Sequence, residues 1–285
     1  MANIPGRNWV GLGIALAAVC LPAHAHSGAH VPDEGWSFDP VVAALLIASS
    51  TAQWVGRRRI GAARDRVAPR WRVAAFWSAV GVLVLALFSP LDARADTSFA
   101  WHMSQHLLLM LVAAPLLAVS NAHFVALYAF PLQWRRRIGQ AAGIVPGLRQ
   151  GPRRWLTPWV AAAAFTLGVW LWHAPVMYEA ALHHRWIHTT EHLVFLVTAS
   201  VFWRVVATAG DRRMSVAASM LLVTLVALQG NLMAALITLA PHPIYPTYAV
   251  AGGLADQQIA GLIMWVPAGL VYLASSVWAL RKILA

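Results

Sequence analysis

Residues 99–120 read FAWHMSQHLLLMLVAAPLLAVS, an apolar stretch that contains no Asp, Glu, Lys or Arg. A helix needs about 20 residues of this kind to cross the roughly 30 Å hydrocarbon core of a bilayer. Lipid offers the backbone no hydrogen-bond partners, so a segment that crosses it has to satisfy its own N–H and C=O groups as a helix. The stretch therefore predicts a transmembrane helix that begins with a group of histidines.

Six further apolar stretches are long enough, or nearly long enough, to cross a membrane. The seven predicted spans cover residues 40–56, 71–90, 99–120, 157–174, 190–208, 214–239 and 259–280. The first is the shortest, and no soluble domain longer than a loop lies between any two of them. The predicted fold class is all-α, a polytopic bundle of seven transmembrane helices.

The composition excludes several classes of protein. Of the 285 residues, 60% are hydrophobic and 11% are charged, whereas soluble domains carry about 25% charged residues. An ordinary soluble globule, a disordered chain and a disulfide-stapled secreted module are excluded. The net charge of +11 does not indicate a nucleic-acid partner, because a basic patch on a soluble fold needs far more polar surface. We therefore expect contact with membrane lipid and none with nucleic acid.

The basic residues predict the orientation of the spans. Of the 21 Lys and Arg residues, Arg7 lies near the N-terminus, and Arg94 and Arg185 fall on one side of the predicted membrane. All the others fall in the opposite loops or at the C-terminus. Because cytoplasmic loops carry the excess of Lys and Arg, we expect the C-terminus in the cytoplasm and the N-terminus on the outer side of the membrane.

The N-terminal residues have the pattern of an export signal. Arg7 is followed by an apolar stretch at 9–21, which is short for a span, and by the A-x-A cleavage pattern at 23–25. We expect residues 1–25 to be a cleavable signal peptide and residues 26–285 to form the seven-helix transmembrane domain. The alternative is a signal anchor that stays on the protein.

The cysteine content limits the kinds of metal site. Cys20 is the one cysteine of the chain, and it lies in the segment that cleavage would remove. The mature protein would then have no structural disulfide, thiolate zinc site, iron–sulfur cluster or covalently attached c-type haem. An oxidising compartment fits the absence of thiols.

The histidines collect on the side that lacks Lys and Arg, so general polarity does not explain their placement. For any single histidine the alternative is an interfacial anchor. Of the 12 histidines, His24 lies in the signal segment and His123 on the cytoplasmic side; the other ten are His26, His30, His102, His106, His173, His183, His184, His188, His192 and His242.

The predicted third span carries the first ordered pair. His102 and His106 are four residues apart and share a helix face, and Met110 extends the same stripe by one turn. Two imidazoles on one helix face can chelate a metal, and thioether ligands such as Met103 and Met110 suit Cu(I). We take all four as candidate metal ligands; the alternative for the methionines is packing in the core.

A second pair, His188 and His192, repeats the spacing on the predicted fifth span, and His173 ends the fourth span on the same side. Ionisable groups at membrane depth cost several kcal/mol unless they face a partner or water, so we expect the three helix ends to converge on one metal. Asp256, at the start of the last span, is a candidate ligand or an acceptor that orients an imidazole. Its alternative role is that of a helix N-cap.

Three kinds of site fit these residues. A copper site at the His/Met cluster is the first. The pattern His188-x-x-Glu191-His192 also matches a zinc motif in which the glutamate is the general base, so a membrane-embedded zinc hydrolase is the alternative. A b-type haem protein is the third, but transmembrane electron transfer would call for a second histidine pair near the cytoplasm, where His123 stands alone.

Four blocks follow one another on the predicted spans: His102-Met-Ser-Gln-His106 with Pro115, Trp172-His-Ala-Pro175 with Tyr178, Glu191-His192 with Phe202-Trp203, and Asp256-Gln-Gln-Ile-Ala-Gly-Leu-Ile-Met-Trp265. In this order they resemble the multi-span CtaG family of cytochrome c oxidase assembly factors, over about residues 37–280. The single-span copper chaperone that shares this name and uses cysteines is unrelated.

The resemblance implies a multi-pass protein of the bacterial plasma membrane that is needed to mature an aa-type terminal oxidase and handles copper. On this basis the motif histidines are expected to be ligands, and the protein is not expected to be an enzyme. Copper is the expected metal, with zinc or haem as alternatives. The expected partners are terminal oxidase subunits or periplasmic copper chaperones.

Overall fold

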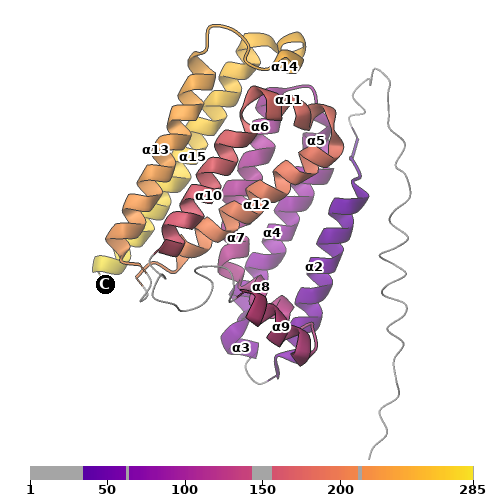
Figure 1. Ribbon diagram of the computed structural model, residues 1–285, viewed down its shortest axis with the longest axis vertical. Helices are drawn as coiled ribbons and strands as arrows, with labels where there is room; N and C mark the ends of the chain where they lie inside the picture. Colours follow the sequence, from indigo (N-terminus) through magenta and orange to yellow (C-terminus); the bar gives the residue numbers. More distant parts are fainter. Residues whose placement is uncertain (1–34, 62–63, 143–155, 211–213, 285) are drawn as a thin grey trace, which may run out of the picture.

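The computed structural model describes residues 35–61, 64–142, 156–210 and 214–284, and within these ranges it contains helices and no strand (Figure 1). The all-α prediction is thus confirmed for the described residues. The predicted signal peptide lies outside them. The helices are α2 (Pro40–Arg59), α3 (Arg64–Val67), α4 (Arg70–Phe88), α5 (Pro90–Ala95), α6 (Phe99–Leu107), η2 (Leu108–Ala113), α7 (Ala114–Ser120), α8 (Ala122–Leu127), α9 (Leu132–Ala142), α10 (Leu156–Trp172), α11 (Pro175–His183), α12 (Arg185–Ala207), α13 (Val216–Leu239), α14 (Pro246–Ala251) and α15 (Gly253–Leu284).

Five helical segments are long and apolar enough to cross a membrane, namely α4, the continuous α6–η2–α7, α12, α13 and α15. A sixth span results if α10 and α11 are counted as one broken helix. Helix α2 occupies the predicted first span but is not among these segments, because Gln53 and the arginines at 57–59 interrupt its apolar sequence. The described residues therefore form a membrane bundle with five or six candidate spans, and the count of seven stays a prediction.

The break between α10 and α11 comes from a proline. The two helices meet at an angle of 73°, where Ala174 adopts an extended conformation (φ −62°, ψ 129°) and Pro175 begins α11. A residue that precedes proline is pushed out of the helical region, and proline is well suited to the first turn of the next helix. The bend turns the chain immediately after His173, so this ring lies at the corner rather than along a straight span.

The third span combines two kinds of helix. Helix α6 runs without a break into η2, a π-helical turn, and then into α7, so residues 99–120 form one span as predicted. A π-helical turn bonds each residue to the fifth one along, which rotates the later side chains relative to the earlier ones. Asn121 ends α7 in the left-handed conformation (φ 56°), which asparagine tolerates.

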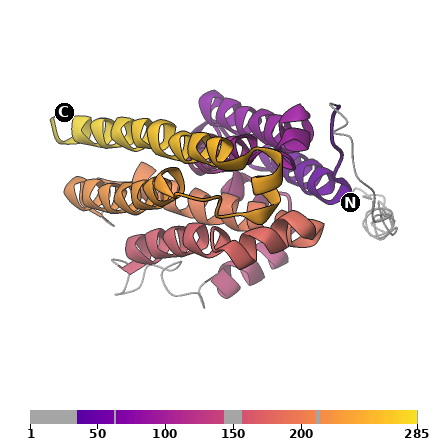
Figure 2. The same ribbon diagram turned by 90° about the horizontal axis from the view of Figure 1, so that it is seen from above.

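Helices α13 and α15 lie side by side over much of their length (Figures 1 and 2). A Cβ atom at Gly261 would stand 2.1 Å from Thr238 Oγ1 and 2.9 Å from Thr238 N, so the close approach depends on glycine. The side chain of Gln257 fixes the same pair, because its Nε2 donates to the Ile237 carbonyl (3.1 Å). This packing brings the first turns of α15, including Asp256, to the start of α6.

Helix α2 is fastened to the bundle at both of its ends. At one end Arg185 Nε forms an ion pair with Asp39 Oδ2 (3.2 Å). At the other end α2 touches α8 so closely that a Cβ atom at Gly56 would stand 1.9 Å from the carbonyl oxygen of Val125. Arg59 adds a hydrogen bond to a backbone carbonyl beyond α8 (2.6 Å). Between these two ends, Leu46 packs against the apolar cluster that contains Leu83 and Leu87.

Short helices α5, α11 and α14 lie at the end of the bundle where α6 and α12 begin (Figure 1). Buried aromatic side chains fill the space between them. The ring centroids of Phe99 and Tyr245 are 4.9 Å apart, and those of Tyr178 and Tyr245 are 4.1 Å apart. Tyr178 also lies 5.3 Å from His102, so this aromatic packing forms one wall of the histidine site described next.

Candidate metal centre

Four histidines from two helices form a compact group at the beginning of α6 and α12. His102 and His106 are one turn apart on α6, and His188 and His192 are one turn apart on α12. Each offers one ring nitrogen, and these four nitrogens all lie within 4.8 Å of one another. Among the described residues, this is the one group of His, Cys, Asp and Glu that could hold a metal ion.

The four rings pair both along and between the helices. Along α6, Nε2 of His102 lies 3.0 Å from Nε2 of His106. Between the helices, the ring centroid of His102 is 5.2 Å from that of His188, and the centroid of His106 is 5.3 Å from that of His192. The sequence spacing predicted each pair, and the fold brings the two pairs together.

Burial makes this arrangement costly unless the nitrogens are satisfied. The exposed fractions are 1% for His102, 0% for His106 and 8% for His192. Within the part of the chain that the structure describes, His106 Nδ1, His188 Nε2 and His192 Nε2 are buried without a hydrogen-bond partner. Buried polar atoms are normally paired, and leaving one unpaired costs about 1–3 kcal/mol. A metal ion would use nitrogen lone pairs of this kind, so the residues fit a metal site.

A tyrosine fixes the proton on one of the rings. The Tyr248 hydroxyl donates to the carbonyl of Ala95 (2.6 Å), which can only accept. Burial raises the pKa of Tyr248 well above its ordinary value, so the hydroxyl keeps its single proton at neutral pH. Its contact with His102 Nδ1 (2.8 Å) therefore has the ring nitrogen as donor. His102 carries its proton on Nδ1 and directs the Nε2 lone pair toward the other histidines.

Replacement of Tyr248 by phenylalanine is expected to lower metal affinity about 10–100-fold, the range typical for loss of a partner that orients a metal-binding histidine. The reason is that His102 would lose the acceptor that holds its proton on Nδ1. Titration of the purified protein with metal would measure the change. Tyr272→Phe is the matched control, because Tyr272 is also buried but stacks on Trp203; equal affinity losses in both variants would contradict the assignment.

His173 lies beside the four-histidine group without belonging to it. Its ring centroid is 6.5 Å from that of His106. Its Nδ1 lies 2.7 Å from the Val169 carbonyl, and because a carbonyl only accepts, Nδ1 carries the proton. Nε2 is then a buried lone pair without a partner among the described residues. The predicted convergence of the fourth span on the site thus brings His173 next to the group rather than into it.

Glu191 is the acidic neighbour of the group. Its Oε1 lies 3.9 Å from His106 Nε2, and both side chains are fully buried. Neither carboxylate oxygen has a hydrogen-bond partner in the described part of the chain. A buried carboxylate needs a compensating charge, which a metal ion held by the histidines would provide.

Comparison with protein families places this histidine site in a known group. Residues 36–285 match the family described as the cytochrome c oxidase caa3 assembly factor, Caa3_CtaG. The chain belongs to this family. The match extends over almost all the described residues and includes both histidine pairs, so the resemblance seen in the sequence is confirmed. Searches among curated proteins and among solved structures returned no match.

In this member of the assembly-factor family, Asp256 caps a helix of another segment. Its carboxylate accepts from the backbone N–H of Phe99 (2.6 Å) and from the hydroxyl of Ser98 (2.8 Å), at the first turn of α6. A carboxylate at a helix N-terminus satisfies free N–H groups and complements the helix dipole. The sequence predicts, as the alternative role of Asp256, a helix N-cap at the start of the last span. Its contacts are those of a capping residue, but the helix that it caps is α6 and not its own helix, α15. Asp256 holds the helix that carries His102 and His106.

The two methionines predicted as ligands lie in the main apolar core. Met103 is fully buried and Met110 is 7% exposed, and both pack in the cluster that contains Phe99 and Phe195. Met110 lies in the π-helical turn that follows α6. Packing in the core, the alternative considered for both, accounts for their surroundings.

One residue of the site could not be found by sequence reasoning. Tyr248 is 146 residues away from His102 in the chain, and no spacing rule connects a tyrosine on α14 with a histidine on α6. The resemblance blocks likewise leave it out. Its role becomes visible once α14 is seen to lie over the start of α6 (Figure 1).

Proposed function

We propose that the four histidines 102, 106, 188 and 192 bind one copper ion, and that the protein uses this site to support maturation of a cytochrome c oxidase. The observation that carries the proposal is the convergence of four buried imidazole nitrogens within 4.8 Å. Imidazole ligands suit copper as well as zinc. The family's role in cytochrome c oxidase assembly favours copper, because copper handling is the role that the resemblance implies.

The proposal includes a place in the cell. After removal of residues 1–25, the domain 26–285 would cross the bacterial plasma membrane seven times, with α2 as the first span. The histidine group lies at the end of the bundle away from Arg57–Arg59 and the C-terminus (Figure 1). By the positive-inside rule that end faces the periplasm. Periplasmic copper chaperones would supply the ion, and terminal oxidase subunits would receive it.

The ligand set explains how the ion could be both held and released. Copper binds neutral imidazole, so protons compete with the metal and affinity falls as the solution becomes acidic. Such ligands exchange metal more readily than a closed thiolate site. Three of the histidines are buried, and His188 is partly exposed, so His188 marks the side from which an ion would enter or leave.

Deleting the gene is expected to lower cytochrome c oxidase activity at limiting copper, and excess copper in the medium is expected to restore part of it. The purified wild-type protein should retain about one copper ion per chain after dialysis, measured by elemental analysis. Normal oxidase activity in the deletion strain at limiting copper would contradict the assembly role. Zinc in place of copper would contradict the choice of metal.

The position of Glu191 favours a second candidate, a membrane-embedded zinc hydrolase with Glu191 as general base. Its carboxylate is 3.9 Å from His106 Nε2 and has no other partner among the described residues. Glu191→Gln separates the two functions. A hydrolase should lose most of its activity on lipid or peptide substrates, since loss of general-base catalysis costs about 10²–10⁴-fold. The assembly factor should show no hydrolysis before or after the change.

A further inference from the structure

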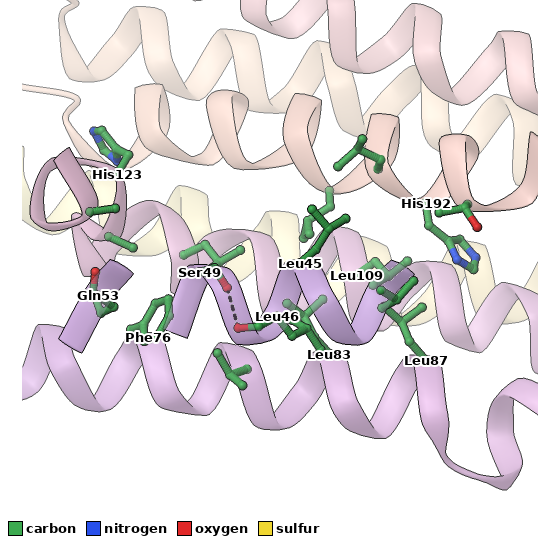
Figure 3. A pocket seen from close by; sticks show the side chains of 18 residues that line it. Leu45, Leu46, Ser49, Gln53, Phe76, Leu83, Leu87, Leu109, His123 and His192 are labelled. Carbon is green, nitrogen blue, oxygen red and sulfur yellow. Dashed lines mark hydrogen bonds between the residues drawn. The ribbon is translucent and has the colours of Figure 1, made fainter. Parts of the chain in front are cut away.

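A cavity of about 380 Å³ lies between α2 and the helices α4, α7, α8 and α12. Figure 3 shows leucines from both sides facing into it, among them Leu46 on α2 and Leu83 and Leu87 on α4. Its walls are almost entirely apolar. At one end lies His192 of the metal site, and at the other end lie Gln53 and His123 (Figure 3).

The cavity lies along the middle of α2. Helix α2 is held at Asp39 by an ion pair and at Gly56 by direct backbone contact, and between these points Leu46 packs against the apolar cluster on α4 beside the cavity. Protein interiors are close-packed, and voids larger than a water molecule are few. An apolar void holds water poorly, because water needs two to four polar partners. Hydrocarbon is the medium that would fill this one, and Leu45, which lines it, is 53% exposed.

The end of the cavity near the arginines is polar. Gln53 is 3% exposed, and its Oε1 has no hydrogen-bond partner in the described part of the chain. Arg57 follows Gln53 by one turn and lies on the same face of α2. Trp54, 53% exposed with Arg58 stacked 3.8 Å above its ring, marks the depth of the membrane interface, where tryptophan collects. A hydrogen-bonding, anionic group fits this end.

The length of the cavity matches one hydrocarbon chain. Val42 and Gln53 line its two ends on α2, and a rise of 1.5 Å per residue puts them about 17 Å apart. Half of a bilayer's hydrocarbon core is about 15 Å deep. A chain that enters from the leaflet on the arginine-rich side would therefore reach from Gln53 to the neighbourhood of His192.

We infer that this cavity binds a phospholipid with an anionic headgroup, drawn from the leaflet on the arginine-rich side. One acyl chain occupies the apolar groove between α2 and α4, and the headgroup lies beside Gln53 and Arg57. The lipid fills the space between α2 and α4 and forms the wall of the metal site behind His192. The inference does not depend on copper or on the proposed function.

The test uses the full-length protein in nanodiscs of equal parts phosphatidylglycerol and phosphatidylcholine, each in turn carrying a photoreactive group on an acyl chain. Cross-links from phosphatidylglycerol are expected in the peptides that contain Leu46 and Leu83, and several-fold fewer from phosphatidylcholine. Cross-links confined to outward-facing positions such as Leu228, which is 64% exposed, would overturn the inference. Equal labelling by the two lipids would contradict the inferred preference for an anionic headgroup.

Two pairs of variants test the acyl-chain groove and the headgroup preference separately. Leu83→Trp fills the groove and is expected to remove most of the cross-linking, whereas Leu85→Trp, on the same helix but 50% exposed, should leave it unchanged. Arg57→Ala is expected to reduce the preference for phosphatidylglycerol, and Arg66→Ala, which removes an exposed charge on α3, should not. A neutral isoprenoid found in the groove of the protein purified from cells would contradict the inference.

Discussion

The double variant His102→Ala/His106→Ala is expected to reduce the copper retained by the purified protein from about one ion per chain to background. Both imidazoles of α6 disappear, including the nitrogens that face each other at 3.0 Å. Loss of a partner that merely orients a ligand typically costs 10–100-fold in affinity, so loss of two ligands should cost more. Elemental analysis after dialysis would measure copper, and a competition titration would give the change in affinity.

The matched control for this variant is His183→Ala/His184→Ala. These two histidines are exposed and end α11 on the same side of the bundle, so the change removes as many imidazoles without touching the site. Copper retention should stay at the wild-type value. His188→Ala tests the other helix and should also lose copper, even if the α6 variant folds poorly. Copper bound normally by both His102→Ala/His106→Ala and His188→Ala would show that the ion is held elsewhere.

Much of the helical framework could be predicted because a membrane-spanning helix has a simple sequence pattern, a long unbroken run of apolar residues. The predicted spans at 99–120 and 214–239 agree with the observed segments within two residues at either end, since unbroken apolar sequence and the need for internal hydrogen bonds define them. Helix α2 shows where this signal fails. Gln53, which lines the cavity beside α2, and the arginines at 57–59 lower the mean hydropathy of the helix.

The broken fourth span shows a second limit. Pro175 indicated an end to the helix, and the bend that precedes this proline sets α11 at 73° to α10. The angle depends on how α11 packs against α12, which a one-dimensional pattern does not contain. For this reason the sequence predicted that His173 would lie near the two histidine pairs but not how far its ring is from theirs.

The site could be predicted in part, because the four-residue spacing of each histidine pair is a local property of a helix. That the two pairs would meet followed from the cost of leaving ionisable groups in lipid. The residues that contact or support these histidines could not be predicted from the sequence. Asp256 reaches the start of α6 because α15 packs beside it, and Tyr248 reaches His102 from α14. None of these contacts has a signature in the local sequence.

The contact between α2 and α8 supplies the second large expected effect. A Cβ atom at Gly56 would stand 1.9 Å from the Val125 carbonyl oxygen and 2.8 Å from its carbon. Both atoms belong to the backbone of α8, which cannot move aside as a flexible side chain could. Gly56→Ala would therefore force the two helices apart at the end of α2 that contacts α8. Overpacking of a tight contact costs about 1–3 kcal/mol, and sometimes more.

Gly56→Ala should consequently lower the melting temperature of the protein in detergent by several degrees, since 1 kcal/mol corresponds to about 2–4 °C in a chain of 150–250 residues. Gly81→Ala is the matched control. Gly81 also lies inside a helix, but a Cβ atom there would meet nothing within 4 Å, and alanine favours a helix over glycine by about 1 kcal/mol. Its melting temperature should stay the same or rise. If both variants melt alike, the close contact at Gly56 does not contribute to holding α2 against α8.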